Sequence, residues 1–191
     1  MWLGERRGMH GHRARLLRQA RGRVLEIGAG TGLNASLYPS TAEELILTEP
    51  VPAMLRRLGR RTTRDPRVRT MSVLGSELQV EDSSVDTVVS TLVLCTVPSV
   101  EPVLAEIARV LKPGGRLLFC EHVRATDARL ARRQDRFAGL WAAFAQGCRC
   151  NRDTLSLLLD RFTLEKVDHA RWSGMPSLVR PLVMGSAVPI R

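Results

Sequence analysis

Aromatic residues and lysine are both scarce in this chain. Only 4% of its 191 residues are Phe, Trp or Tyr, and two of its 29 basic residues, Lys112 and Lys166, are lysines. Proteins that bind single-stranded nucleic acid interleave aromatic and basic side chains so that bases can stack on them. The shortage of aromatics argues against that class, and the preference for arginine indicates a compositional bias more than many separate functional guanidinium groups.

Long apolar runs and a cysteine framework are also missing. The most apolar stretch, residues 85–97, is shorter than the roughly 18 to 20 residues that span a bilayer. Residues 1–7 lack the apolar region of a secretory signal. Four unevenly spaced cysteines do not predict a set of disulfides, and Cys148 and Cys150 lack a second pair of zinc ligands nearby. We expect a cytoplasmic protein with no transmembrane segment and no metal site.

The formal net charge is +10, and much of it lies in two arginine runs. Such runs can bind phosphate groups or anionic lipid. Neither run contains an aromatic residue, so we expect solvated arginines on the surface. The first run comprises Arg6, Arg7, Arg13, Arg15, Arg18, Arg21 and Arg23, and the second comprises Arg56, Arg57, Arg60, Arg61, Arg64, Arg67 and Arg69.

Short β-rich runs alternate with helix-like segments from Arg23 onward, which is the pattern of a parallel sheet covered by helices. The fold class predicted is α/β: one domain over residues 1–191, with a doubly wound, mostly parallel seven-stranded sheet and helices on both faces. The nearly continuous apolar run from Val85 to Leu92 predicts a central strand. The predicted strands span residues 23–27, 44–48, 68–73, 85–90, 116–121, 162–170 and 178–187.

Proline and glycine mark several predicted helix ends. Pro52 and Pro102 each predict the first turn of a helix, where proline is favoured. The residues Lys112, Pro113, Gly114 and Gly115 then end the second of these helices. Further helical segments are predicted over residues 1–22, over an insertion at residues 124–147, and over residues 153–161 with Asn151 as the N-cap.

The strongest motif is a predicted strand that runs directly into a glycine-rich turn at residues 24–32. Gly28, Gly30 and Gly32 allow a ligand to approach the backbone and permit dihedral angles that other residues avoid. A following helix would offer free backbone N–H groups. A dinucleotide fingerprint needs glycine where Leu33 stands, and a phosphate loop needs Gly-Lys-Ser/Thr, which is absent from the sequence.

Two glutamates accompany the glycine turn. Glu49 ends the second predicted strand about 20 residues after Gly28, where a carboxylate can accept hydrogen bonds from two ribose hydroxyls; the alternative is an exposed loop acid. Glu26 lies at the tip of a strand predicted to be buried, where a carboxylate costs several kcal/mol unless it is paired. A cationic ligand would be such a partner.

These residues together resemble the class I S-adenosylmethionine-dependent methyltransferases. The resemblance rests on Glu26-x-Gly28-x-Gly30-x-Gly32, Glu49, residues 86–90 and the sequence Val110-Leu111-Lys112-Pro113-Gly114-Gly115. It implies a Rossmann-like fold and S-adenosyl-L-methionine as cofactor. Residues 91–95, 121–123, 147–148, 152 and 179–181 further resemble a methyltransferase-like family whose animal members are thiol S-methyltransferases, although the hydrophobic N-terminal anchor of those members is missing here.

The resemblance implies contacts with the cofactor at specific positions. The three glycines, with Glu26 beneath them, would line its methionine and ribose portion, Glu49 its ribose hydroxyls, and Thr91 and Leu92 its edge. The adenine loop of the family often carries an acid followed by a small residue, and here Leu74 stands near the position of the acid. Either Glu77 replaces that acid through a shift of one residue, or Ser76 holds the adenine.

The candidates on the acceptor side follow from the chemistry. In-line methyl transfer depends mainly on positioning, and a thiol acceptor needs little help from a base because its pKa is about 8.5. An oxygen or carbon acceptor would need a base, for which His122 is the candidate; alternatively, His122 only forms hydrogen bonds with the sheet edge or the insertion. Phe137, Trp141 and Phe144 share one helix face and either roof the acceptor pocket or form a core stripe. Arg152 either orients an anionic acceptor or forms an ion pair at the helix start with Asp153 or a neighbour.

We predict transfer of a methyl group from S-adenosyl-L-methionine to a small-molecule acceptor, with a thiol as one candidate. One alternative is methylation of RNA or DNA, but the Asn/Asp-Pro-Pro-aromatic motif of many such enzymes is replaced by Ser90-Thr91-Leu92-Val93. The other is a cofactor-binding protein without catalysis. The sequence leaves open the identity of the acceptor and whether the protein is a monomer or a dimer.

Overall fold

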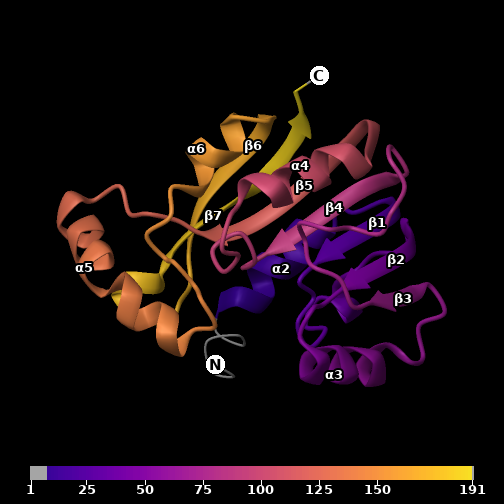
Figure 1. Ribbon diagram of the computed structural model, residues 1–191, viewed down its shortest axis with the longest axis horizontal. Coiled ribbons are helices and arrows are strands. Elements are labelled where there is room, and N and C mark those ends of the chain that lie inside the picture. The colour runs from indigo at the N-terminus through magenta and orange to yellow at the C-terminus, as the bar shows by residue number, and fades with distance from the viewer. Residues whose placement is uncertain (1–7, 191) are drawn as a thin grey trace.

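Seven strands form one sheet in the computed structural model, which describes residues 8–190 (Figure 1). The strands are β1 (Gly22–Ile27), β2 (Ala42–Thr48), β3 (Val68–Met71), β4 (Val85–Thr91), β5 (Leu111–His122), β6 (Phe162–Arg171) and β7 (Pro181–Pro189). The helices are α2 (His10–Leu17), α3 (Pro52–Thr62), α4 (Glu101–Val110), α5 (Ala128–Phe144) and α6 (Thr154–Leu159), with 3-10 turns η2 (Ala35–Leu37) and η3 (Ser177–Val179).

The strand order is β3-β2-β1-β4-β5-β7-β6. The first five of these strands are parallel, whereas β7 runs antiparallel to both β5 and β6. This order confirms the predicted mostly parallel, doubly wound α/β fold. The direction of winding reverses between β1 and β4, and open α/β sheets bind their ligands at the carboxyl ends of the strands at such a point.

Side chains that alternate along the central strands form two buried clusters. Leu25 and Phe119 lie in the cluster that α4 and α6 cover. Val24 and Leu118 lie in the cluster that α2 and α3 cover. Helices therefore pack on both faces of the sheet, as predicted, while α5 stands out from the sheet on the side away from α3 (Figure 1).

The amino-terminal segment is helical over His10–Leu17 and is anchored by Met9, Leu16 and Leu17, which are fully buried. The prediction of a helical segment over residues 1–22 extends further, and its residues 1–7, with Arg6 and Arg7, lie outside the described residues. The prediction of solvated arginines is wrong for Arg13, which is only 7% exposed because it hydrogen-bonds buried polar groups.

The fifth strand begins earlier than predicted. Helix α4 ends at Val110, as the proline and glycines after it indicate, but β5 starts at once at Leu111 and not at Arg116. Leu111 pairs with Val85, and the register shifts before Thr87 pairs with Arg116. A bulge at residues 112–115 therefore lets one strand follow the helix without an intervening loop.

Other predicted boundaries also differ. Strand β3 ends at Met71 and not at residue 73, and β7 begins at Pro181 because residues 177–179 form a 3-10 turn. The N-cap of α6 is Asp153, whose carboxylate accepts the Ser156 N–H at 3.2 Å. Asn151, the predicted cap, instead donates to Asp135 from a position two residues further from the helix.

Candidate functional site

The glycine turn after β1 takes the conformation that requires glycine. Gly28, Gly30 and Gly32 have φ values of 57°, 59° and 80°. A Cβ on Gly28 would lie 2.7 Å from Cγ2 of Val93, so the segment after β4 lies directly against the turn. Apart from Gly30 itself and its two chain neighbours, no residue of the described range 8–190 has a heavy atom within 4 Å of a Cβ built on Gly30. The turn is therefore open to a ligand at Gly30.

The segment after this turn differs from the prediction. In place of an α-helix, the chain forms the single 3-10 turn η2. Asn34, which precedes η2, is buried and turns its amide toward the sheet. The ligand-facing backbone is thus that of the glycine turn itself and not that of a long helix N-terminus.

The Glu49 carboxylate is buried and accepts hydrogen bonds from the backbone of two segments, the glycine turn and the start of α3. Its Oε2 accepts the Gly30 backbone N–H at 2.9 Å, and its Oε1 accepts the Val51 N–H at 2.9 Å. The alternative of an exposed loop acid is therefore wrong. The carboxylate fixes the glycine turn relative to the start of α3 and lies next to the open side of Gly30.

Glu26 obtains its partners from the protein. Its carboxylate accepts hydrogen bonds from Nδ2 of Asn34 at 2.8 Å and from the Tyr38 hydroxyl at 2.7 Å. Arg13 donates to Oδ1 of Asn34 and to Oγ1 of Thr91, so a positive charge lies one hydrogen bond away. Burial raises the pKa of Glu26 in spite of these partners. The hydrogen bonds from Asn34 and Tyr38 thus satisfy the Glu26 carboxylate within the protein. No cationic ligand is needed to pair it.

Residues 91–97, which we call the β4 loop, are fixed by hydrogen bonds to the neighbouring strand β5. The buried Glu121 carboxylate accepts the Ser90 hydroxyl at 2.7 Å and the Val93 N–H at 3.1 Å. Within the loop, Leu92 has a φ of 60°, a conformation that L residues with side chains adopt rarely. Glu121 therefore supports the backbone on which Thr91 and Leu92 stand.

Arg152 holds the β4 loop from the other side. Its guanidinium donates to the carbonyl oxygen of Leu94 and, at 3.0 Å, to that of Val97. Asp153 caps α6 instead, and among residues 8–190 no ion pair joins Arg152 to Asp153 or to a neighbouring acid. The alternative of an ion pair at the helix start is therefore wrong. Nothing in the sequence marks these carbonyl partners, because they lie more than 50 residues away.

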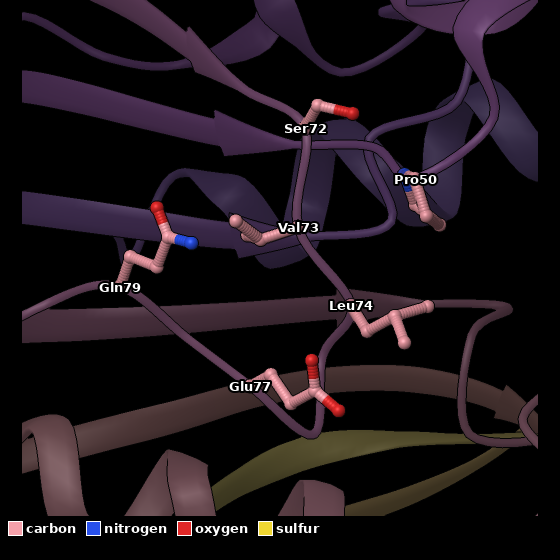
Figure 2. A pocket seen from close by; sticks show the side chains of 6 residues that line it. All are labelled: Pro50, Ser72, Val73, Leu74, Glu77 and Gln79. Carbon is pink, nitrogen blue, oxygen red and sulfur yellow. The ribbon is translucent and has the colours of Figure 1, made fainter.

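A pocket of about 300 Å³ opens beside the ends of β2 and β3. Figure 2 shows that Pro50 comes from the segment after β2, whereas the other lining residues lie on the segment after β3. Glu77 lines the pocket from a turn in which its N–H donates to the Leu74 carbonyl. Ser76 lies in the same turn but is not among the lining residues, which are Pro50, Ser72, Val73, Leu74, Glu77 and Gln79.

His122 ends β5 in a buried position. Its ring stacks on Trp172 with centroids 5.7 Å apart, and burial lowers the pKa of its imidazole to about 4. Within residues 8–190, its Nδ1 has no hydrogen-bond partner. At neutral pH the ring is therefore uncharged and weakly basic.

The three aromatic residues of α5 are placed unequally. Trp141 packs against a buried cluster that contains Cys95, Cys148 and Val179. Phe137 is 40% exposed and Phe144 is 81% exposed. The alternative of a core stripe therefore holds for Trp141 alone, because the helix projects beyond the sheet and leaves the other two rings open to solvent.

Comparison with known proteins identifies the family of the chain. The family described as methyltransferase domain matches residues 25–119, which carry the glycine turn, Glu49 and the β4 loop. The thiol S-methyltransferase TMT1B of Rattus norvegicus is 34% identical over 177 residues, covering 86% of this chain and 70% of the relative. TMT1A of Homo sapiens is 34% identical over 171 residues with the same coverage. The chain is an S-adenosylmethionine-dependent methyltransferase of this family.

Solved structures agree with the fold of this methyltransferase. The N-methyltransferase NodS from Bradyrhizobium japonicum, in complex with S-adenosyl-L-homocysteine, matches 98% of the chain with a TM-score of 0.76 at 19% identity, over 88% of its own length. Geranyl diphosphate methyltransferase in complex with SAM matches 95% of the chain with a TM-score of 0.71 at 16% identity, over 84% of its own length. At these identities the likeness concerns the fold alone.

S-adenosyl-L-methionine is the cofactor of the methyltransferase, and the residues present suit it. The glycine turn leaves open space at Gly30, and a buried carboxylate, Glu49, borders that space. The pocket beyond Pro50 continues along the same edge of the sheet. The open glycine turn suits the methionine portion of the cofactor, the carboxylate suits its ribose hydroxyls, and the pocket suits its adenine base.

The described part of the methyltransferase contains no helix that is both long and apolar enough to cross a bilayer. In residues 8–190, no three His, Cys, Asp or Glu side chains are grouped so that they could hold a metal ion. The prediction of a cytoplasmic location remains a prediction.

Proposed function

We propose that this methyltransferase transfers the methyl group of S-adenosyl-L-methionine to the sulfur atom of a small-molecule thiol. One observation carries the proposal: relatives that match 86% of the chain at 34% identity are named thiol S-methyltransferases. When bound, S-adenosyl-L-methionine supplies a methyl group on a positively charged sulfur that departs as a neutral thioether. The residues of the chain then have to bind, orient and shield the reactants.

We assign the cofactor contacts on the carboxyl edge of the sheet. Each oxygen of Glu49 accepts one backbone N–H, and a carboxylate oxygen has a second lone pair, so both oxygens remain able to accept a ribose hydroxyl. The backbone of Gly28, Gly30 and Gly32 follows the methionine and ribose portion. Glu26 acts indirectly because it positions Asn34 below the turn.

The adenine base of the cofactor is assigned to the pocket beyond Pro50. Of the two alternatives for its contact, Glu77 is favoured because its side chain lines that pocket, while Ser76 contributes its backbone turn. Thr91 and Leu92 border the methionine end, where the β4 loop approaches Gly28. Together with Glu49, these contacts divide the cofactor between four loops, which follow β1, β2, β3 and β4.

A thiol suits the environment of His122 better than a hydroxyl does. A thiol with a pKa near 8.5 is about 3% thiolate at pH 7 and supplies its own nucleophile. A hydroxyl acceptor needs a base, and an imidazole whose pKa is lowered to about 4 by burial accepts a proton poorly at neutral pH. His122 therefore serves as part of the wall of the acceptor pocket, in its stack with Trp172, and proton abstraction by it is not required.

The acceptor is assigned to the side of the β4 loop that faces away from the sheet. Leu92 and Met175 pack against both the cluster of Trp172 and the cluster of Trp141. These two indole rings thus flank a common apolar region beside the predicted position of the methyl group. The exposed Phe137 and Phe144 extend the apolar side of α5 outward from it, and Arg152 acts through its hold on the β4 loop.

A matched pair of acceptors tests the proposal. The full chain is incubated with methyl-labelled S-adenosyl-L-methionine and either thiophenol or phenol, which differ in one atom, and with an amine and an RNA in parallel. We expect label in thiophenol alone, at a rate that rises with pH until the thiol is ionised. Label in phenol, amine or RNA but not in thiophenol would refute thiol specificity. Cofactor binding by calorimetry without transfer to any acceptor would instead support a protein without catalysis.

A further inference from the structure

Two thiols from distant parts of the chain meet behind the β4 loop. The Sγ atoms of Cys95 and Cys148 lie 3.7 Å apart, and both side chains are buried. Neither cysteine forms a disulfide in this structure. A disulfide has an S–S length of about 2.0 Å, so the two sulfur atoms are in van der Waals contact and need to approach by roughly 1.7 Å to bond.

The backbones on either side of this pair already touch. The Arg149 N–H donates to the Cys95 carbonyl oxygen at 2.7 Å. A Cβ on Gly147 would lie 3.1 Å from the Thr96 carbonyl oxygen, which shows a close approach of the two chains. These two contacts hold the backbone segments that carry Cys95 and Cys148 close together on either side of the sulfur atoms.

The two sulfur atoms differ in their surroundings. The contact with the Cys95 thiol and the nearby charge of Arg152 lower the pKa of Cys148. The same contact, burial and the negative charge of Glu121 raise the pKa of Cys95 well above its ordinary value. Cys148 is therefore the more nucleophilic partner at neutral pH, and Cys95 keeps its proton.

Cys150 provides a contrast within the same cluster. It is buried beside Cys148, and burial raises the pKa of its thiol to about 11. A thiol of this kind is almost wholly protonated near pH 7 and reacts slowly with oxidants. The cluster thus holds one activated sulfur, one partner in contact with it and one inert neighbour.

We propose that Cys95 and Cys148 form an oxidation site, which a peroxide converts into a disulfide. The Cys148 sulfur attacks one oxygen of the peroxide, the O–O bond breaks, and Cys148 becomes a sulfenic acid while hydroxide leaves and takes up a proton. The Cys95 sulfur then loses its proton and attacks the Cys148 sulfur, and a second water leaves. Two thiols lose two electrons and two protons, and one hydrogen peroxide becomes two water molecules.

The bond would link the cofactor side of the site to the acceptor side. Cys95 lies on the β4 loop, whose Val93 contacts the glycine turn, and Cys148 follows α5. The β4 loop is already fixed by Glu121 and Arg152, so the disulfide adds a third link and restrains the end of α5. An oxidant would thereby act on the site without contacting either the cofactor or the acceptor.

The experiment uses the full chain, without cofactor or acceptor, treated with hydrogen peroxide and digested without reduction. We expect one cross-linked peptide pair that contains Cys95 and Cys148 and that a phosphine reductant separates. A phosphine is used because thiol reductants are candidate acceptors. Cys95→Ala and Cys148→Ala should each abolish the cross-link, whereas Cys150→Ala and Cys120→Ala should retain it.

Several outcomes would overturn the proposal. They are a cross-link between Cys148 and Cys150, over-oxidation of Cys148 without any cross-link, and no oxidation of the native chain at peroxide concentrations that oxidise the urea-unfolded chain. The wild-type digest decides the question even where an alanine variant fails to fold. Because no acceptor is present, the result is also independent of thiol methylation.

Discussion

The Glu49 carboxylate accepts the backbone N–H of Gly30 at 2.9 Å, across the gap between β2 and the glycine turn. Its second oxygen binds Val51 at the start of α3. One buried side chain thus sets the position of the turn and also borders the space where a ribose would lie. Loss of its charge should affect both.

Glu49→Gln is expected to weaken binding of S-adenosyl-L-methionine by about tenfold or more, because an amide has one accepting oxygen and hydrogen bonds to charged groups contribute about 1.5–3 kcal/mol. Isothermal titration calorimetry measures the change. Glu43→Gln is the matched control, since Glu43 is exposed at the amino end of the same strand. Equal affinity of the Glu49 variant and the wild type would remove Glu49 from the cofactor site.

Gly30→Ala separates backbone strain from contact with a ligand. Because φ is 59° and the space around the Cβ is open, we expect a loss of about 1–2 kcal/mol in the free energy of unfolding and a larger loss of cofactor affinity. Gly139→Ala, in the middle of α5, should be neutral or stabilising by up to about 1 kcal/mol. Urea unfolding and calorimetry measure the two effects; unchanged affinity in Gly30→Ala would show that the cofactor lies elsewhere.

The pKa of His122 predicts a loss of stability in acid. Its pKa is lowered from 6.5 to about 4 on folding, so the stability that it contributes is complete above pH 6.5 and is lost as the pH falls toward 4. Between pH 7 and pH 4.5, wild type should lose about 2–3 kcal/mol more than His122→Phe, which keeps the stack on Trp172. Urea unfolding at both pH values is the measurement.

His169→Phe, at an exposed position of β6, is the control for the acid experiment and should follow the wild type. A pH dependence in His122→Phe equal to that of the wild type would show that the imidazole of His122 titrates in the folded protein as it does in the unfolded chain.

Arg152→Ala should loosen the β4 loop. Two carbonyl oxygens, those of Leu94 and Val97, lose their partner, which costs about 1–3 kcal/mol for a buried group. We expect a lower kcat with a smaller change in cofactor affinity, and partial recovery in Arg152→Lys, which retains one donor group. Arg149→Ala is the control, because Arg149 is exposed and its contact to Cys95 uses the backbone. An equal effect in both variants would contradict a specific role.

The part of this protein that could be predicted from sequence is local. The glycine turn and Glu49 follow from the conformational freedom of glycine and from a spacing along the chain. The buried strands follow from alternation and β-branched residues, as in Val85, Val88 and Val89. Each of these signals is contained within about 25 residues, so each can be recognised before the fold is known.

The part that could not be predicted joins distant residues. Arg13 stands in a basic run that looks like surface, yet it supports a carboxylate network through Asn34, in the turn after β1. The partners of Arg152 lie 55 and 58 residues before it. Helix periodicity correctly places Phe137, Trp141 and Phe144 on adjoining positions, but only the packing of α5 decides that two of them are exposed.

The residues assigned to the cofactor lie between positions 26 and 92, whereas those assigned to the acceptor lie between 122 and 175. The proposed cofactor site and the proposed acceptor site therefore come from different stretches of one chain. Glu121 and Arg152 join the two stretches at the β4 loop. Such a division lets the second stretch diverge toward new acceptors while the first stays intact. A graft of a relative's acceptor stretch that preserves these two joints should change the acceptor and leave cofactor affinity as it was.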